Sequence, residues 1–158
     1  MQPSRKSKAS ASKEQPTLRA RGLRLLARRE HTRRELAQKL APYVAEGDDL
    51  EALLDDFIAS GWLSEARVVE QLVHAKRSRY GPARIRQVLV QRGVSQDAVA
   101  ETVTRLRQGE LEAARSIWAR KFDAPRSAEE RARQLRFLQA RGFSFETAMR
   151  VVSGRDEP

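Results

Sequence analysis

The sequence predicts an all-α protein built from three tandem three-helix repeats that form an elongated, curved body. Leu, Val, Ala, Arg, Glu and Gln dominate the 158 residues, and most of these side chains lose little rotamer freedom in a helix. No segment alternates apolar and polar residues over the length of a strand. Helix-capping residues recur in front of apolar stripes with helical spacing, in three successive cycles.

The first cycle contains three expected helices. An apolar stripe through Leu18 and Leu25 predicts a helix over residues 18–29. Thr32 and Glu35 have the spacing of a capping box and open a second helix, which Pro42 and Gly47 end. The third helix is expected to begin after Asp48 or Asp49 and to end at Gly61, with the inward residues Leu50, Leu53, Leu54, Phe57 and Ile58.

The second cycle repeats this plan with cleaner boundaries. Ser64 can cap its first helix, and Pro82 fits the first position of its second helix, where a missing N–H costs nothing. Gly93 ends that helix, and Ser95 caps the third. The residues expected to face inward are Val69, Leu72, Val73, Ile85, Val88, Leu89, Val99, Val103 and Leu106.

A third cycle follows. Ser127 and Glu130 have a second capping-box spacing, Gly142 ends the helix that follows, and Ser144 caps the last helix. The residues expected to face inward are Leu111, Ala114, Trp118, Leu135, Leu138, Phe145, Ala148, Met149 and Val152.

Two of the cycles align directly, because residues 88–95 match residues 137–144 at a constant offset, with Arg-Gly-apolar-Ser between the second and third helices. The first cycle has a longer joint, from Ala41 to Asp49. Such periodicity is typical of tandem helical repeats. We therefore expect a disordered basic tail over residues 1–16 and three repeats over residues 17–62, 63–108 and 109–158.

The charge balance indicates an anionic partner. Lys and Arg number 31 against 21 Asp and Glu, giving a net charge of +10, which suits nucleic acid, an acidic protein surface or an anionic membrane. The absence of cysteine excludes disulfides, thiolate catalysis and cysteine-ligated zinc. No apolar run approaches the ~20 residues that span a bilayer, and no signal sequence is apparent, so we expect a cytoplasmic protein without membrane attachment.

The sequence offers few candidates for catalytic residues. The two histidines, His31 and His74, are interpreted as a helix-boundary residue and a surface residue. The acidic residues between Asp48 and Asp56 suit helix capping and a solvated face better than a metal site. We therefore expect no enzyme, catalytic residue, metal, cofactor or small-molecule substrate. Core packing is favoured over base stacking for Trp62, Trp118 and Phe122.

The basic residues are more informative. From Gln71 to Gln96 there is no Asp or Glu, whereas a solvated face usually mixes both signs. The planar guanidinium of arginine suits pairing with phosphate or carboxylate, although an ordinary exposed face remains the alternative. The candidate binding residues in this run are Lys76, Arg77, Arg79, Tyr80, Arg84, Arg86 and Arg92. Further candidates, in basic segments that also contain acidic residues, are Arg33, Arg34, Arg133 and Arg141.

Several segments together resemble the RecX family. They are residues 25–36 (LLARREHTRREL), Gly61-Trp62-Leu63, residues 80–94 (YGPARIRQVLVQRGV) and, in the last cycle, Arg120-Lys121-Phe122 with residues 137–143. The order and spacing of these segments, over about residues 18–152, follow the three units of the family.

The resemblance implies a modulator, usually an inhibitor, of the RecA recombinase. Family members bind in the groove of the RecA–DNA filament and affect ATP hydrolysis, strand exchange and filament growth, which implies a role in DNA repair, homologous recombination and the SOS response. It also implies a monomer whose own DNA binding is weak, non-specific and made mainly through phosphate. A direct DNA-binding protein of helix-turn-helix type that acts without RecA, or a structural adaptor, remains the alternative.

Overall fold

The computed structural model describes residues 14–154, and every regular element in this range is helical, which confirms the all-α class. The tail expected over residues 1–16 lies almost wholly outside the described residues. The elements are α1 (Leu18–Arg28), α2 (Arg33–Leu40), a short 3-10 helix (Ala41–Tyr43), α3 (Leu50–Ala59), α4 (Glu65–Lys76), α5 (Pro82–Arg92), α6 (Gln96–Gln108), α7 (Glu110–Ala119), α8 (Ala128–Ala140) and α9 (Phe145–Ser153).

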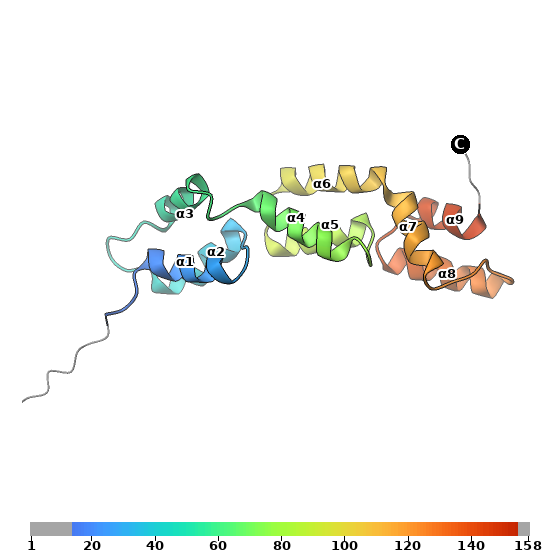
Figure 1. Cartoon of the computed structure of the whole chain (residues 1–158), viewed down its shortest axis with the longest axis horizontal. Coiled ribbons are helices and arrows are strands. Elements are labelled where there is room, and N and C mark those ends of the chain that lie inside the picture. Colours follow the sequence, from blue (N-terminus) through green and yellow to red (C-terminus); the bar gives the residue numbers. More distant parts are fainter. Residues whose placement is uncertain (1–13, 155–158) are drawn as a thin grey trace, which may run out of the picture.

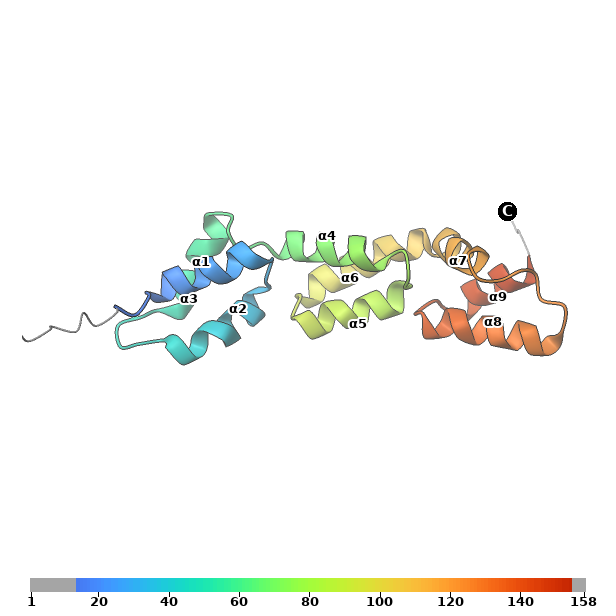
Figure 2. The same cartoon turned by 60° about the horizontal axis from the view of Figure 1, so that its bottom comes forward.

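The helices form three units in a row, each with its own hydrophobic cluster (Figure 1). Unit 1 contains α1–α3, unit 2 contains α4–α6 and unit 3 contains α7–α9. Leu36, Leu40, Leu54 and Phe57 are fully buried in unit 1. Leu63, which the sequence analysis assigns to the second repeat, also packs into the cluster of unit 1. The row is elongated, as the turned view in Figure 2 also shows.

The expected helix caps are present. Thr32 and Glu35 form the full capping box, and Asp49 rather than Asp48 caps α3. The second expected box is only half formed, because the Glu130 carboxylate accepts from the N–H of Arg126 instead of reaching the cap residue. The side chains that accept a hydrogen bond from the backbone N–H three residues later are those of Thr17, Thr32, Asp49, Ser64, Ser95, Ser127 and Ser144.

Three expected core residues are instead exposed. Ile58 is 48% exposed in the last turn of α3, and Trp62 is 55% exposed just after it, because the left-handed turn at Gly61 directs Leu63 into the core instead. Phe145 is 59% exposed at the first position of α9, and Phe143, ahead of the cap, fills the core of unit 3.

A glutamate latch joins the first and third helices in units 2 and 3, and the sequence analysis missed it. Glu65, the first residue of α4, accepts from the backbone N–H of Ser95 at 2.5 Å and from its hydroxyl at 2.9 Å. Glu110, the first residue of α7, accepts from the N–H of Ser144 at 2.7 Å. Each carboxylate therefore satisfies an otherwise unpaired donor at a helix start.

Replacing Glu110 by Ala is expected to destabilise unit 3 by about 2 kcal/mol, because the part-buried N–H of Ser144 would lose its charged acceptor. Glu112→Ala provides the matched control, since Glu112 lies in the same first turn of α7 but is exposed. Urea unfolding of both variants measures the difference. Equal losses of stability would show that the latch contributes nothing beyond helix-end electrostatics.

The second helices of the three units meet end to end along one edge of the molecule (Figure 2). At the junction of units 2 and 3, Gly81 N–H donates to the Arg141 carbonyl at 2.7 Å and Ala83 N–H donates to the Gly142 carbonyl at 3.0 Å. The free N–H groups at the start of α5 thereby pair with carbonyls at the end of α8. The two helix dipoles are arranged head to tail, which favours this contact.

The junction of units 1 and 2 repeats the arrangement with side chains. The Thr32 hydroxyl donates to the Arg92 carbonyl at 2.6 Å, and Arg34 donates to the Gln91 carbonyl at 2.8 Å. The repeated Arg-Gly-apolar-Ser motif is thus a junction motif. Its Arg-Gly end abuts the preceding unit, its apolar residue is buried, and its serine caps the third helix.

Candidate partner-binding surface

The acid-free run spans the end of α4, a tight turn and the whole of α5. The N–H groups of Arg79 and Tyr80 both donate to the Lys76 carbonyl, which closes α4 and directs the chain into α5. Within residues 14–154, none of the cations at the turn and the start of α5 pairs with a carboxylate. Their charge is therefore available to a partner. Arg77, Arg79, Arg84 and Arg86 are exposed, and Lys76 is half-buried.

Tyr80 is the centre of this surface. Lys76 Nζ lies 5.7 Å from the centroid of its ring, and the guanidinium carbons of Arg84 and Arg141 lie 5.8 and 5.5 Å from it. Arg141 belongs to unit 3 and reaches this ring because its carbonyl accepts from Gly81. We call Lys76, Arg77, Arg79, Tyr80, Arg84, Arg86 and Arg141 the basic surface.

A second aromatic ring extends the basic surface into unit 3. Arg141 also lies 5.0 Å from the centroid of Phe137, and Lys121 lies 4.4 Å from the same centroid. Phe137 in turn packs edge-on against Phe122 at 5.2 Å between centroids. The sequence analysis did not select Lys121, because only the fold brings the end of α7 beside α8. Arg133, a candidate on α8, is exposed and has no carboxylate partner within residues 14–154.

Three of the candidate residues make internal contacts instead. Arg33 donates to the carboxylates of Glu51 and Asp55, both at 2.6 Å, and these hydrogen bonds raise the pKa of Arg33. Arg34 caps carbonyls at the end of α5, and Arg92 Nε donates to Glu35 at 2.8 Å. Arg33 joins α2 to α3 within unit 1, whereas Arg34 and Arg92 join units 1 and 2. We therefore leave Arg33, Arg34 and Arg92 outside the basic surface.

Glu35 and His31 give the first junction a distinct electrostatic character. Burial raises the pKa of Glu35, but hydrogen bonds from Arg92, Arg29 and Thr32 outweigh it and lower this pKa to about 2. His31 is 1% exposed, and burial lowers its pKa, so its ring is neutral. Its Nδ1 lies 2.9 Å from the Arg29 carbonyl, which identifies Nδ1 as the protonated nitrogen and leaves Nε2 to accept from Lys39. His31 is thus a packed structural residue.

The depressed pKa of Glu35 makes the stability of this junction pH-dependent. Since the folded-state pKa lies below the ordinary 4.5, the carboxylate stabilises the fold above about pH 4.5, and this contribution disappears as pH falls toward 2. Glu35→Gln is expected to cost about 2 kcal/mol at pH 7 and nearly nothing at pH 2. Urea unfolding at both pH values measures this. Glu51→Gln, on an exposed ion pair, should cost under about 1 kcal/mol at either pH; a cost as large as that of Glu35→Gln would contradict the assignment.

The acidic residues of unit 1 have structural uses. Asp49 caps α3, Asp48 accepts from the N–H of Ala45, and Asp56 pairs with Arg19. Within residues 14–154, no three His, Asp or Glu side chains form a group that could hold a metal ion. No helix in the same range has the length and apolar character needed to cross a bilayer.

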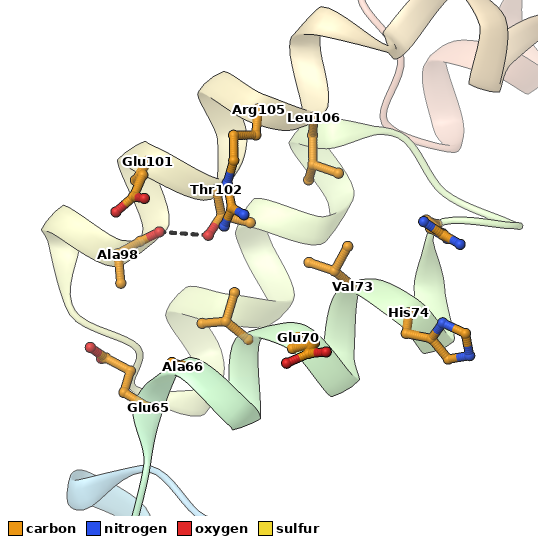
Figure 3. Close-up of a pocket in the computed structure, with 12 residues that line it drawn as sticks. Glu65, Ala66, Glu70, Val73, His74, Ala98, Glu101, Thr102, Arg105 and Leu106 are labelled. Atoms are coloured by element: carbon orange, nitrogen blue, oxygen red, sulfur yellow. Dashed lines mark hydrogen bonds between the residues drawn. The ribbon is translucent and has the colours of Figure 1, made fainter.

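A groove lies between α4 and α6 of unit 2 (Figure 3). Its volume is about 670 Å³, and its floor contains Val69, Val73 and Leu106. Arg105 of α6 lines this groove and also the adjoining cavity at the junction with unit 3, where Arg120 joins it. The sequence analysis did not select either arginine, because each lies among mixed charges in the sequence.

Comparison with protein families matches the chain in three consecutive segments. The matching descriptions are the first three-helix domain of RecX over residues 19–55, the second over residues 64–103 and the third over residues 108–152. These segments follow the order of the three units.

Similar proteins and structures agree with this match. A regulatory protein RecX from Leptothrix cholodnii is 46% identical over 144 residues, covering 90% of this chain and 92% of the relative. One from Herbaspirillum seropedicae is 50% identical over 129 residues, covering 81% and 84%. The crystal structure of RecX from Lactobacillus salivarius superposes with a TM-score of 0.72 at 18% identity, covering 87% of this chain and 93% of that one, and so shares its fold.

Proposed function

The chain belongs to the RecX family of regulatory proteins, and from this premise we propose that it modulates the RecA recombinase by binding along the RecA–DNA filament. The observation that carries the proposal is the basic surface at the middle of an elongated row of units. A long body with unpaired cations fits a long anionic polymer better than a small substrate. Inhibition is the expected sign of regulation.

The proposed mechanism is occupation of the filament groove. A body that lies along the groove hinders entry of a second DNA strand and bridges neighbouring RecA protomers. Bridged protomers exchange and change conformation less readily, which slows ATP hydrolysis, strand exchange and filament growth. The protein would act in this way as a monomer in the cytoplasm, without a cofactor or catalysis of its own, in the regulation of DNA repair, homologous recombination and the SOS response.

The basic surface supplies the proposed contacts. Its guanidinium groups can donate two parallel hydrogen bonds to a phosphate or a carboxylate, and Tyr80 fixes the positions of Arg84 and Arg141 by cation–π contact. Contacts to phosphate carry no sequence information. Binding to DNA alone should therefore be weak, salt-dependent and indifferent to sequence.

Binding measurements at several salt concentrations test this proposal. With about four phosphate contacts, affinity for single-stranded DNA should fall about 50-fold between 50 and 200 mM salt. RecA filaments on the same DNA should bind more tightly than the naked strand at each salt concentration. Equal affinity for naked DNA and filaments would contradict a RecA-directed function. Tight binding to one duplex sequence without RecA would favour the helix-turn-helix alternative.

A further inference from the structure

We propose that the groove between α4 and α6 is the docking site for a partner-protein segment that is basic at one end, apolar in the middle and acidic at the other end. The inference deepens the proposed function and rests on it, since it takes the partner to be a RecA protomer of the filament. It adds a protein-binding groove beside the basic surface, and Arg77 belongs to both.

The floor of the groove consists of apolar side chains. Val73 of α4 faces Leu106 of α6 across it (Figure 3), and the lining also includes Val69 and the small residues Ala66 and Ala98. The hydroxyl of the buried Thr102 donates to the Ala98 carbonyl at 2.7 Å, as the dashed line in Figure 3 marks. Because this hydroxyl is already hydrogen-bonded, the apolar side chains of a docked segment can cover it without leaving a buried donor unsatisfied.

The rim carries a gradient of charge. Glu70 and Glu101 stand nearer the start of α4 and α6, whereas His74 and Arg105 stand nearer their ends (Figure 3). Because α4 and α6 run in the same direction, the acidic residues of both helices lie toward one end of the groove and the basic residues toward the other. A docked segment of matching polarity can bind in only one direction.

The basic end of the groove continues into a second cavity, of about 370 Å³, at the junction with unit 3. Arg77 and Arg105 line both spaces, and Arg120 of unit 3 completes the cavity while its guanidinium donates to the Ser78 carbonyl. No carboxylate lines this second cavity. Arg77, Arg105 and Arg120 therefore border the cavity in which the acidic end of the segment would lie.

Charge and length together define the occupant. Arg77, the C-cap of α4, follows Ala66 by eleven positions, a distance of about 16 Å at the helical rise of 1.5 Å per residue. This length accommodates about five extended residues or about three helical turns. Nucleic acid fits poorly, because Glu70 and Glu101 would repel phosphate and the apolar side chains of the floor offer bases no hydrogen-bond partner.

Two variants of the full chain test the groove. Ala66→Trp fills it without changing charge, and Arg105→Glu reverses its basic end; both residues are exposed. Ala100→Trp and Arg107→Glu are the matched controls, since both are exposed on α6 but do not line the groove. Binding is measured to RecA filaments and to the same single-stranded DNA without RecA, and thermal unfolding checks the fold of each variant.

We expect each groove variant to bind filaments about tenfold more weakly than its control and to bind naked DNA as its control does. Filament binding equal to that of the controls would overturn the groove assignment. Wild-type protein that binds filaments no better than naked DNA would instead overturn the proposed function, so the two failures are distinguishable.

A photo-crosslinking residue at position 66 gives a readout that does not depend on the stability of a variant. In the complex with filaments, it should form cross-links to the basic end of a RecA segment whose following residues are apolar and then acidic, which mass spectrometry of the digest identifies. Cross-links to DNA alone, or an absence of cross-links in a complex that has formed, would overturn the proposal.

Discussion

Reversing three charges of the basic surface is expected to weaken filament binding at least about 100-fold. The variant carries Lys76→Glu, Arg79→Glu and Arg84→Glu, and none of the three cations pairs with a carboxylate within residues 14–154, so each is free for a partner. Each lost contact to phosphate or carboxylate removes about 1 kcal/mol or more, and the new carboxylates repel the same groups. The slope of log affinity against log salt concentration should correspond to about one phosphate contact fewer for each residue replaced.

A matched triple variant separates this site from the net charge of the protein. Arg24→Glu, Arg28→Glu and Arg107→Glu change the charge equally at exposed positions outside the basic surface. Fluorescence anisotropy with labelled filaments, at fixed salt, compares the two proteins. If both triple variants lose affinity equally, binding depends on overall charge and the basic surface has no special role.

Gly142→Ala is expected to cost about 3 kcal/mol or more and to separate units 2 and 3. Gly142 has φ +98, a region that side chains with a Cβ rarely adopt, and an added Cβ would lie 2.5 Å from the backbone nitrogen of Arg84. Because the backbone of Arg84 cannot move aside as a flexible side chain can, the free-energy cost of the steric clash adds to the cost of placing alanine at a positive φ. The two backbone hydrogen bonds of the junction would break, and Arg141 would leave the ring of Tyr80.

Gly61→Ala supplies the control for the conformational cost alone. Gly61 has φ +78, but an added Cβ there meets nothing within 4 Å, so the expected cost is about 1 kcal/mol. Urea unfolding compares the two variants, and filament binding should fall about tenfold only for Gly142→Ala. Equal costs for the two variants would show that the junction of units 2 and 3 is not tightly packed.

Local signals in the sequence predicted the fold class, the helix caps and the three cycles. Thr32 with Glu35 and the serines at 64, 95 and 144 act through neighbours three residues away, so their roles are visible without the fold. The same reasoning misplaced Ile58, Trp62 and Phe145, because a periodic stripe does not reveal where a turn redirects the chain. Phe143 took the core position that the sequence analysis gave to Phe145.

The candidate surface was predictable only in part. The acid-free run selected Lys76, Arg79 and Arg84 as candidate contacts, and none of the three has a carboxylate partner within residues 14–154. The sequence could not separate them from Arg33 and Arg92, whose partners Glu51, Asp55 and Glu35 lie 18 to 57 positions away. The glutamate latches and the approach of Arg141 to Tyr80 depend in the same way on contacts between distant segments.

Hydrolysis of ATP by RecA filaments on single-stranded DNA tests the central claim most directly. Purified protein is titrated into preformed filaments at constant salt, with the Lys76→Glu, Arg79→Glu, Arg84→Glu variant in parallel. We predict that the wild-type protein lowers the rate of hydrolysis in a saturable manner and that the variant requires at least about 100-fold more protein for the same effect. A rate that does not change at any ratio of wild-type protein to RecA would contradict the account.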